Sequence, residues 1–246
     1  MEKIKVAGVS YLNTKPFLYG INKLMADQIE LTVQHPSKLA EQLMNQEVDV
    51  ALVPVSVIPL IKQSKNISNY CIGCDGEVSS VVICSDVPIE RADQIYLDYQ
   101  SRTSVQLSKV LLKNHWHLNP KLINASPGFE NEVKGKTAGL FIGDRALELK
   151  KKYEFVYDLG FEWKKLTSLP FVFACWVAVT KLSSQFESDL NAAFAFGIKN
   201  MQTVIEEEQL QFPAVDVRDY LTQKIQFNFD DEKKKALKLF YELSAQ

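Results

Sequence analysis

The sequence has few of the residues that build metal sites or disulfide frameworks. Its 246 residues include four cysteines and three histidines. Cys71 and Cys74 have the spacing of half a zinc or redox site, but there is no second close pair to complete it. Cys84 and Cys175 lie in apolar, strand-like runs, where cysteine usually serves as a small core residue. We therefore expect no metal and no redox role for these thiols.

Long apolar runs and an excess of one charge are also missing. No run is long and apolar enough to span a membrane. The 28 Lys and Arg residues nearly balance the 30 Asp and Glu residues, for a net charge of −2. Without an extended basic block, we expect neither a nucleic-acid nor a membrane partner. The sequence starts directly with a strand-like segment and has no apolar signal region, which predicts a cytoplasmic protein.

Glycine and proline are sparse too, with ten and nine residues, and no Gly-rich linker or internal repeat is visible. The composition is 46% hydrophobic and 24% charged, which is typical of a globular protein. A chain of this length can bury a sizeable core, either as one large domain or as two lobes.

Apolar runs alternate with helix-like segments along most of the chain. Strands are expected at residues 4–9, 29–33, 48–53, 78–84, 94–97, 121–124, 137–142, 154–159 and 171–179. Helices are expected after residues 16, 36 and 230 and at 54–61, 103–112, 145–152, 185–207 and 215–223. Successive strand–helix units predict parallel sheets with right-handed crossovers, and the long last strand is expected to return to the first lobe.

One polar stretch follows the first expected strand: Ser10-Tyr11-Leu12-Asn13-Thr14-Lys15-Pro16. Pro16 suits the first position of a helix, and Thr14 or Asn13 could cap its backbone. Open α/β sheets bind ligands at the carboxyl ends of their strands, so this stretch is a candidate binding loop. On pattern alone, an ordinary strand–cap–helix junction is the better explanation.

The same stretch resembles the opening signature of the chorismate dehydratase family, the first enzyme of the futalosine route to menaquinone. Three later stretches match the family in its order. They are Ser101-Arg102-Thr103-Ser104, Gly139-Leu140-Phe141-Ile142-Gly143-Asp144-Arg145-Ala146, and Asp158-Leu159-Gly160 running on to Leu169-Pro170-Phe171-Val172-Phe173-Ala174. Together they extend over most of the chain.

The resemblance implies an α/β fold of the two-lobed type II periplasmic-binding-protein kind. Each lobe would be a mixed, mostly parallel sheet flanked by helices, with a ligand cleft between the lobes. We expect lobe 1 to comprise residues 1–85 plus 178–246, and lobe 2 to comprise residues 86–177.

The activity implied by the resemblance is conversion of chorismate to 3-[(1-carboxyvinyl)oxy]benzoate and water, the reaction of a cofactor-independent carbon–oxygen lyase. Asn13 and Ser80 match the family's catalytic positions, although Ser79 beside Ser80 leaves that assignment open. The implied substrate-binding residues are Tyr11, Ser56, Ser79, Ser101, Arg102, Thr103, Ser104, Asp144, Phe171 and Phe173. The structural alternatives are a helix cap for Ser101 to Ser104 and for Asp144, a packed strand feature for Ser79 and Ser80, and core packing for Phe171 and Phe173.

No strong base appears in the matched motifs, because His35, His115 and His117 all lie outside them. We therefore hypothesise that a carboxylate of the substrate helps to move the proton. The sequence has no phosphate loop and no dinucleotide fingerprint, so we expect no cofactor and a small dicarboxylate, chorismate, as the ligand. The protein is expected to be a monomer or a homodimer.

Two alternatives with the same fold remain. One is a small-anion-binding protein without catalytic activity. The other is 1,4-dihydroxy-6-naphthoate synthase of the same pathway, which uses a different N-terminal motif and an active-site histidine. Ser10-Tyr11-Leu12-Asn13 and the lack of a histidine within a motif favour the dehydratase over the synthase.

Overall fold

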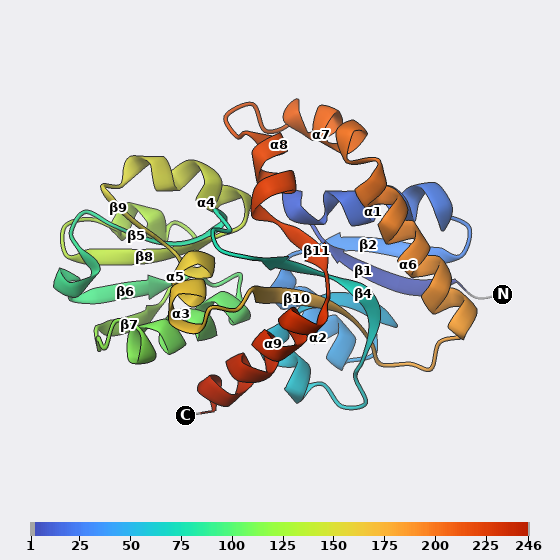
Figure 1. The fold of residues 1–246 in the computed structure, drawn as a ribbon, viewed down its shortest axis with the longest axis horizontal. Coiled ribbons are helices and arrows are strands. Elements are labelled where there is room, and N and C mark those ends of the chain that lie inside the picture. Colours follow the sequence, from blue (N-terminus) through green and yellow to red (C-terminus); the bar gives the residue numbers. More distant parts are fainter. Residues whose placement is uncertain (1–2, 246) are drawn as a thin grey trace. The chain divides into compact units, whose positions relative to one another are not determined.

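A computed structural model describes residues 3–245 and separates the chain into two compact units. Unit 1 comprises the chain up to Gly73 together with Val172–Asp230. Unit 2 comprises Cys74–Phe171 together with the chain from Asp231 onward. Each unit contains one β-sheet covered by helices (Figure 1). The predicted α/β class with two mixed sheets is confirmed.

The sheet of unit 1 has six strands in the order β11-β4-β10-β3-β1-β2. Strands β1, β2 and β3 run parallel, whereas β10 pairs antiparallel with β3 and β11 pairs antiparallel with β4. Its strands are β1 (Ile4–Val9), β2 (Ile29–Gln34), β3 (Val50–Pro54), β4 (Lys65–Cys74), β10 (Phe171–Ala178) and β11 (Gln226–Asn228). Its helices are α1 (Lys15–Leu24), α2 (Pro36–Met44), α6 (Ser184–Lys199), α7 (Met201–Gln209) and α8 (Val217–Asp219), with short 3₁₀ helices at Leu12–Thr14 and Val55–Leu60 and a π-helical turn at Tyr220–Lys224.

The sheet of unit 2 has five strands in the order β7-β6-β8-β5-β9. Strand β6 is parallel to β7 and β8, and β5 runs antiparallel to both β8 and β9. Its strands are β5 (Val81–Ser85), β6 (Gln94–Leu97), β7 (Lys121–Asn124), β8 (Thr137–Ile142) and β9 (Phe155–Asp158). Its helices are α3 (Arg102–Asn114), α4 (Asp144–Leu149), α5 (Leu159–Thr167) and α9 (Asp231–Ser244), with short 3₁₀ helices at Ile89–Arg91, Phe129–Glu132 and Lys150–Lys152.

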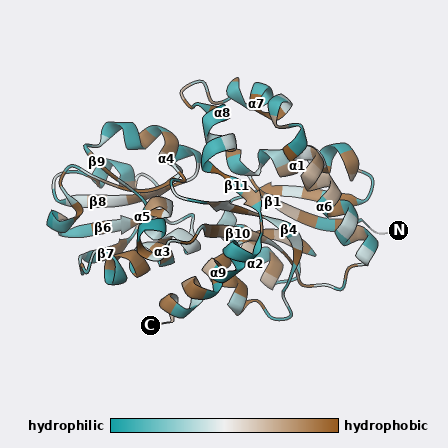
Figure 2. Ribbon diagram, viewed as in Figure 1, coloured by the Kyte–Doolittle hydropathy of each residue, from teal (hydrophilic) through white to brown (hydrophobic). Residues whose placement is uncertain are grey.

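Aromatic side chains form the centre of each core. In unit 1, Phe17 of α1 contacts Trp176 of β10 and Phe194 of α6, with ring centroids 5.9 and 4.7 Å away. In unit 2, Phe240 of α9 contacts Trp163 of α5 at 6.2 Å. Figure 2 shows both brown and teal residues along α9, as expected for a helix that buries one face.

The unit boundaries differ from those that the sequence suggested. Strand β5 pairs with β8 and β9, which assigns residues 74–85 to unit 2. Strand β10 pairs with β3, so residues 172–177 belong to unit 1. Helix α9 belongs to unit 2, because Phe240 packs against side chains of that unit. These pairings connect residues far apart in the sequence, where no local pattern reports them.

Several elements differ from the prediction. Strands β4 and β11 and helix α5 lie in segments for which no regular structure was predicted. The segment 185–207 contains two helices, α6 and α7, instead of one. Strand β5 begins at Val81, so Ser79 and Ser80 lie in the turn before it.

Candidate active site

In unit 1, candidate residues gather at one edge of the sheet. Strands β1 and β3 are parallel neighbours, with Val6 opposite Val50. Their carboxyl ends therefore lie at the same edge. Tyr11 and Asn13 follow β1, and Ser56 follows β3. The structure thus brings these three candidates to one end of the unit 1 sheet.

Asn13 lies in the 3₁₀ turn Leu12–Thr14 and is half-buried. Leu12 and Phe17 are fully buried on either side of it and anchor the loop. The Thr14 hydroxyl donates a hydrogen bond to Asn13 Oδ1 at 3.2 Å, but Thr14, at the N-cap of α1, makes no side-chain bond to the helix backbone. The capping role suggested for Thr14 is therefore wrong. With its oxygen held by Thr14, Asn13 has its amide N–H groups to donate to a ligand.

In unit 2, the remaining polar candidates also gather at one edge. Strand β5 is antiparallel to β8, with Val81 opposite Ile142, so the turn before β5 lies beside the segment after β8. Strand β6 is parallel to β8, and it leads into the segment before α3. Three groups of candidates therefore share this edge: Ser79 and Ser80, Ser101 to Ser104, and Asp144.

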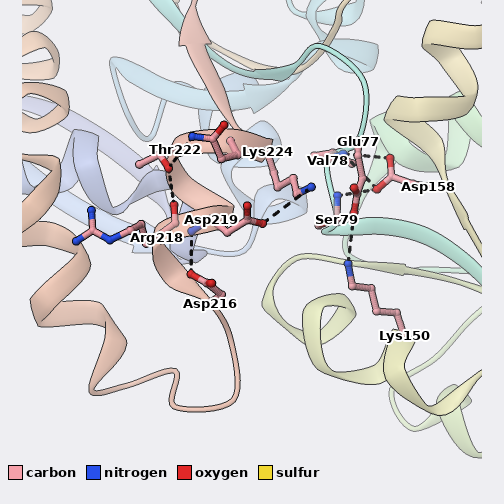
Figure 3. Close-up of polar contacts among 11 residues, drawn as sticks. Glu77, Val78, Ser79, Lys150, Asp158, Asp216, Arg218, Asp219, Thr222 and Lys224 are labelled. Carbon is pink, nitrogen blue, oxygen red and sulfur yellow. Dashed lines mark hydrogen bonds and ion pairs between the residues drawn. The ribbon is translucent and has the colours of Figure 1, made fainter.

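The two adjacent serines have different surroundings. The Ser79 hydroxyl donates to Glu77 Oε1 at 2.6 Å, and Lys150 Nζ lies 3.9 Å from the same oxygen (Figure 3). Ser80 is 1% exposed, and its carbonyl oxygen accepts a hydrogen bond from the Gly143 N–H at 2.8 Å. The Ser79 side chain is thus held by a neighbouring carboxylate, and the assignment of Ser80 as the functional residue of the pair stays a prediction.

Asp158, the last residue of β9, holds the backbone in front of Ser80. Its carboxylate accepts hydrogen bonds from the amides of Val78 at 3.1 Å, Ser79 at 2.6 Å and Phe161 at 3.0 Å. Burial raises the pKa of this carboxyl group, and the three amide donors offset part of the increase. Asp158 was part of a matched motif, but sequence reasoning gave it no role.

Ser101 to Ser104 form the first turn of the 13-residue helix α3. Ser101 is its N-cap: its Oγ accepts the Ser104 amide at 3.1 Å and donates to Ser104 Oγ at 2.9 Å. Thr103 and Ser104 are buried, whereas Arg102 is exposed. Capping therefore accounts for Ser101. The Ser104 hydroxyl keeps its own proton to donate at a helix terminus that favours anions.

Asp144 is the first residue of α4 and follows Gly143, whose φ of +68° suits glycine. The next residue, Arg145, donates to Asp98 Oδ2 at 2.5 Å. Asp98 also accepts the backbone amides of Gln100 and Ile142 at 2.9 and 3.3 Å. Burial raises the pKa of Asp98, partly offset by the Arg145 charge.

Asp98 therefore links the segment before α3 to the end of β8. Sequence reasoning missed this residue as well. An acidic side chain directly after the expected strand 94–97 was the available signal.

The two aromatic candidates are both buried. Phe171 is 1% exposed and packs edge-on against Trp163 and Phe240, at centroid distances of 5.1 and 5.2 Å. Its surroundings within unit 2 match core packing. Phe173, 8% exposed, lies on β10 of unit 1. The role of either ring in substrate binding stays a prediction.

All four cysteines are free thiols and buried. Burial raises the pKa of Cys84 and of Cys175 to about 12. Within residues 3–245, no group of three or more His, Cys, Asp or Glu side chains is arranged to hold a metal ion. His115, outside the matched motifs, pairs with Glu162 at 2.8 Å.

The part of the chain that the structure describes has no helix long and apolar enough to cross a membrane.

Comparisons with known proteins agree with this architecture. A solved structure from Archaeoglobus fulgidus is 18% identical and superposes with a TM-score of 0.73, over 99% of this chain and 97% of its own. A Candida albicans protein described as having the generic periplasmic binding protein fold is 15% identical. It superposes with a TM-score of 0.63, over 100% of this chain and 90% of its own. The predicted periplasmic-binding-protein-like fold is confirmed.

Sequence comparison identifies the family. Chorismate dehydratase from Campylobacter jejuni is 29% identical over 208 residues, which are 83% of this chain and 79% of that protein. A family described as "Menaquinone biosynthesis" matches residues 4–246. Because that match extends over nearly the whole sequence, the chain belongs to the menaquinone biosynthesis family, and it is similar to the chorismate dehydratase of Campylobacter jejuni.

Proposed function

We propose that this protein is a chorismate dehydratase of the futalosine route, which converts chorismate to 3-[(1-carboxyvinyl)oxy]benzoate and water. The observation that carries the proposal is the similarity to a chorismate dehydratase over 83% of the chain. The polar side chains that match the family's motifs also gather at one sheet edge in each unit.

The reaction is an elimination in which the ring loses a hydroxyl group and a hydrogen from a neighbouring carbon. The ring becomes aromatic, and no electrons are gained or lost overall. Because the step needs no oxidant or reductant, we propose that it proceeds without a cofactor. The protein must bind two carboxylates, assist departure of the hydroxyl group and position the proton acceptor.

The first turn of α3 is proposed to bind a carboxylate of chorismate. Ser104 donates its hydroxyl proton, and the backbone amides at the helix terminus add favourable dipoles. Thr103 and Arg102 belong to the same turn and are proposed as further contacts. This carboxylate is anionic before and after the reaction, so the turn contributes mainly to binding.

Asn13 and Ser80 are proposed to act on the departing hydroxyl group. Asn13 can donate through its amide, since Thr14 already occupies its oxygen. Ser80 can donate through its hydroxyl. Neither side chain is a strong base at neutral pH. We therefore propose that the substrate's own carboxylate accepts the ring proton, with the protein holding the reacting groups in place.

The test is to incubate the purified protein with chorismate and identify the product by chromatography and mass spectrometry. The expected product is aromatic and lighter than chorismate by one water. Dialysis against EDTA is expected to leave the rate unchanged. Binding of chorismate without turnover would replace this proposal with that of an anion-binding protein. Activity lost with EDTA and restored by zinc would overturn its cofactor independence.

A further inference from the structure

The turn in front of Ser80 has an unfavourable backbone conformation. Ser79 has a φ of +64°, which a residue with a side chain rarely adopts. The Ser80 amide donates to the Val78 carbonyl oxygen at 2.8 Å. The three residues thus form a γ-turn with a positive φ at its centre, a rare and strained form. Such strain persists only where the surrounding structure imposes it.

Asp158 imposes this conformation from the neighbouring strand. One of its carboxylate oxygens accepts the Ser79 amide at 2.6 Å, and both lie within 3.2 Å of the Val78 amide. Figure 3 shows the Asp158 carboxylate directed at these two residues. The same carboxylate caps α5 through the Phe161 amide at 3.0 Å. Two successive amides of a strained turn are therefore bound to one buried, charged acceptor.

The next residues explain why this acceptor lies so close to the turn. A side chain at Gly160 would come within 2.6 Å of the Gly76 carbonyl oxygen and of Cys74 Sγ. Only glycine at this position lets the first turn of α5 approach the segment that leads into the γ-turn. The sequence Asp158-Leu159-Gly160 thus caps α5 and lets its first turn pack against the loop before Ser80.

The opposite side of the turn is fixed as well. The Gly143 N–H donates to the Ser80 carbonyl oxygen, and the Ser79 hydroxyl is bound to Glu77. The backbone of Ser80 is thereby held on both sides, through its amide and through its carbonyl oxygen. The hydrogen bonds described for the Asp158 carboxylate all come from backbone amides, which are those of Val78, Ser79 and Phe161.

We propose that Asp158 is a positioning residue, which holds the strained Val78–Ser79 turn and thereby fixes Ser80 for the reaction. The inference rests on the function proposed above. Asp158 acts through Ser80 and is not itself a catalytic residue.

Asp158→Asn keeps the size of the side chain but removes the charge and directs an amide donor at backbone donors. Because small displacements of a positioned group can reduce a rate by about 100-fold, we expect kcat to fall by about 10- to 100-fold. The KM for chorismate is expected to change much less, because the carboxylate-binding turn of α3 is untouched.

The decisive readout is the double variant Asp158→Asn with Ser80→Ala. If Asp158 acts through Ser80, the double variant turns over chorismate no more slowly than Ser80→Ala alone. If the double variant instead loses kcat by the product of the two single-variant losses, the proposal is overturned. An unchanged kcat in Asp158→Asn would overturn it as well.

Ser79→Gly in the Asp158→Asn background supplies a rescue test. Glycine adopts positive φ without steric cost, so the turn needs less external support. We expect Ser79→Gly to restore at least part of the lost kcat and of any lost folding. Failure of the rescue in a folded double variant would count against the strained turn as the point of action.

Ser183→Ala is the matched control. Ser183 is the N-cap of α6 in unit 1, where its Oγ accepts the Phe186 amide at 3.1 Å. Its loss removes a capping bond from a helix that carries none of the candidate residues. We expect kcat to be retained in this variant, so a comparable fall would mean that Asp158→Asn acts through general stability.

Amide hydrogen exchange separates this inference from the proposed function. Exchange at Val78, Ser79 and Ser80 should accelerate at least tenfold in Asp158→Asn and stay unchanged in Ser183→Ala. If the wild-type protein leaves chorismate intact, the proposed function is refuted, and the predicted effect on kcat is refuted with it. The exchange data would still decide whether Asp158 holds the turn, and unchanged exchange would refute that.

Discussion

Asn13 and Ser80 have one feature in common: neighbouring groups hold each of them in place. Thr14 binds the oxygen of Asn13, and the backbone of Ser80 is bound on both sides. A fixed donor that meets charge developing in the transition state can accelerate the reaction substantially.

Asn13→Ala removes that donor. We expect kcat to fall by about 100- to 1,000-fold with a smaller change in KM, by analogy with removal of one oxyanion donor. Asn13→Asp places a negative charge beside a dianionic substrate, so it should impair binding as well. Steady-state kinetics test both variants, with circular dichroism as the folding control. Near wild-type turnover in Asn13→Ala would direct attention to Ser80 and Asp144.

Ser104→Ala should act mainly on binding. It removes a hydrogen bond to a carboxylate that keeps its charge throughout the reaction, so KM should rise by about 10- to 100-fold. The cap bond from the Ser104 amide to Ser101 remains, which should preserve α3. Isothermal titration with a non-reactive chorismate analogue gives the affinity directly. An unchanged affinity would mean that Ser104 serves only the cap.

The sequence could place Ser79 and Ser80 near the site but could not choose between them. The two serines differ in backbone conformation, because Ser79 has a positive φ and its amide is bound by the carboxylate of Asp158, 79 residues further along the chain. Neither feature is visible in local hydrophobic patterning. The alternation of apolar residues instead suggested a strand through both serines, whereas β5 begins at Val81.

At the scale of elements, the packing of α1 against α6 positions the loop that carries Asn13. The helices meet at two glycines. A side chain at Gly20 would lie 1.8 Å from the Ala193 carbonyl oxygen, and one at Gly197 would lie 1.7 Å from the Pro16 carbonyl oxygen. Both contacts are with backbone, which cannot rotate away, so α1 depends on glycine at this crossing.

Gly20→Ala should therefore destabilise the protein, although alanine favours helices. Overpacking usually costs about 1–3 kcal/mol, and contact with backbone places this variant at the upper end or beyond. Urea unfolding followed by circular dichroism gives the free energy of unfolding. Asn22→Ala, at an exposed position of α1, is the matched control and should change it by less than about 0.5 kcal/mol. Equal stability of the two variants would contradict the close helix crossing.

Elements with a strong local signal were predicted well. The bounds of β1, β6, β7 and β8 agree with the expected strands, because each contains a short group of apolar residues, most of them favourable in strands. Strand β4 was missed because its first half contains Asn66, Ser68 and Asn69, and its partner β11 is remote in the sequence. Helix α5 was missed because Gly160 weakens its first turn.

At the scale of the whole molecule, contacts between distant segments decide which unit each part joins. Helix α9 was expected to follow the first lobe, as its neighbours in sequence do. Phe240 instead packs against Phe171 and Trp163 of unit 2. Sequence reasoning had no means to see this, since the contact spans about a third of the chain.

The buried thiols give a prediction about the native state. With pKa values of about 12, Cys84 and Cys175 hold only about one part in ten thousand as thiolate at pH 8. All four thiols should react slowly with Ellman's reagent in the native protein and fully in denaturant. Rapid reaction of Cys71 or Cys74 in the native protein would reopen a redox role for that pair.

The most direct measurement is turnover of chorismate by the wild-type protein and by Asn13→Ala, with both proteins confirmed as folded. Product is identified by mass and ultraviolet absorbance at saturating substrate. The proposed function predicts an aromatic product lighter by one water from the wild type, formed about 100- to 1,000-fold more slowly by the variant. Unchanged chorismate with the wild type, or equal rates for the two proteins, would contradict it.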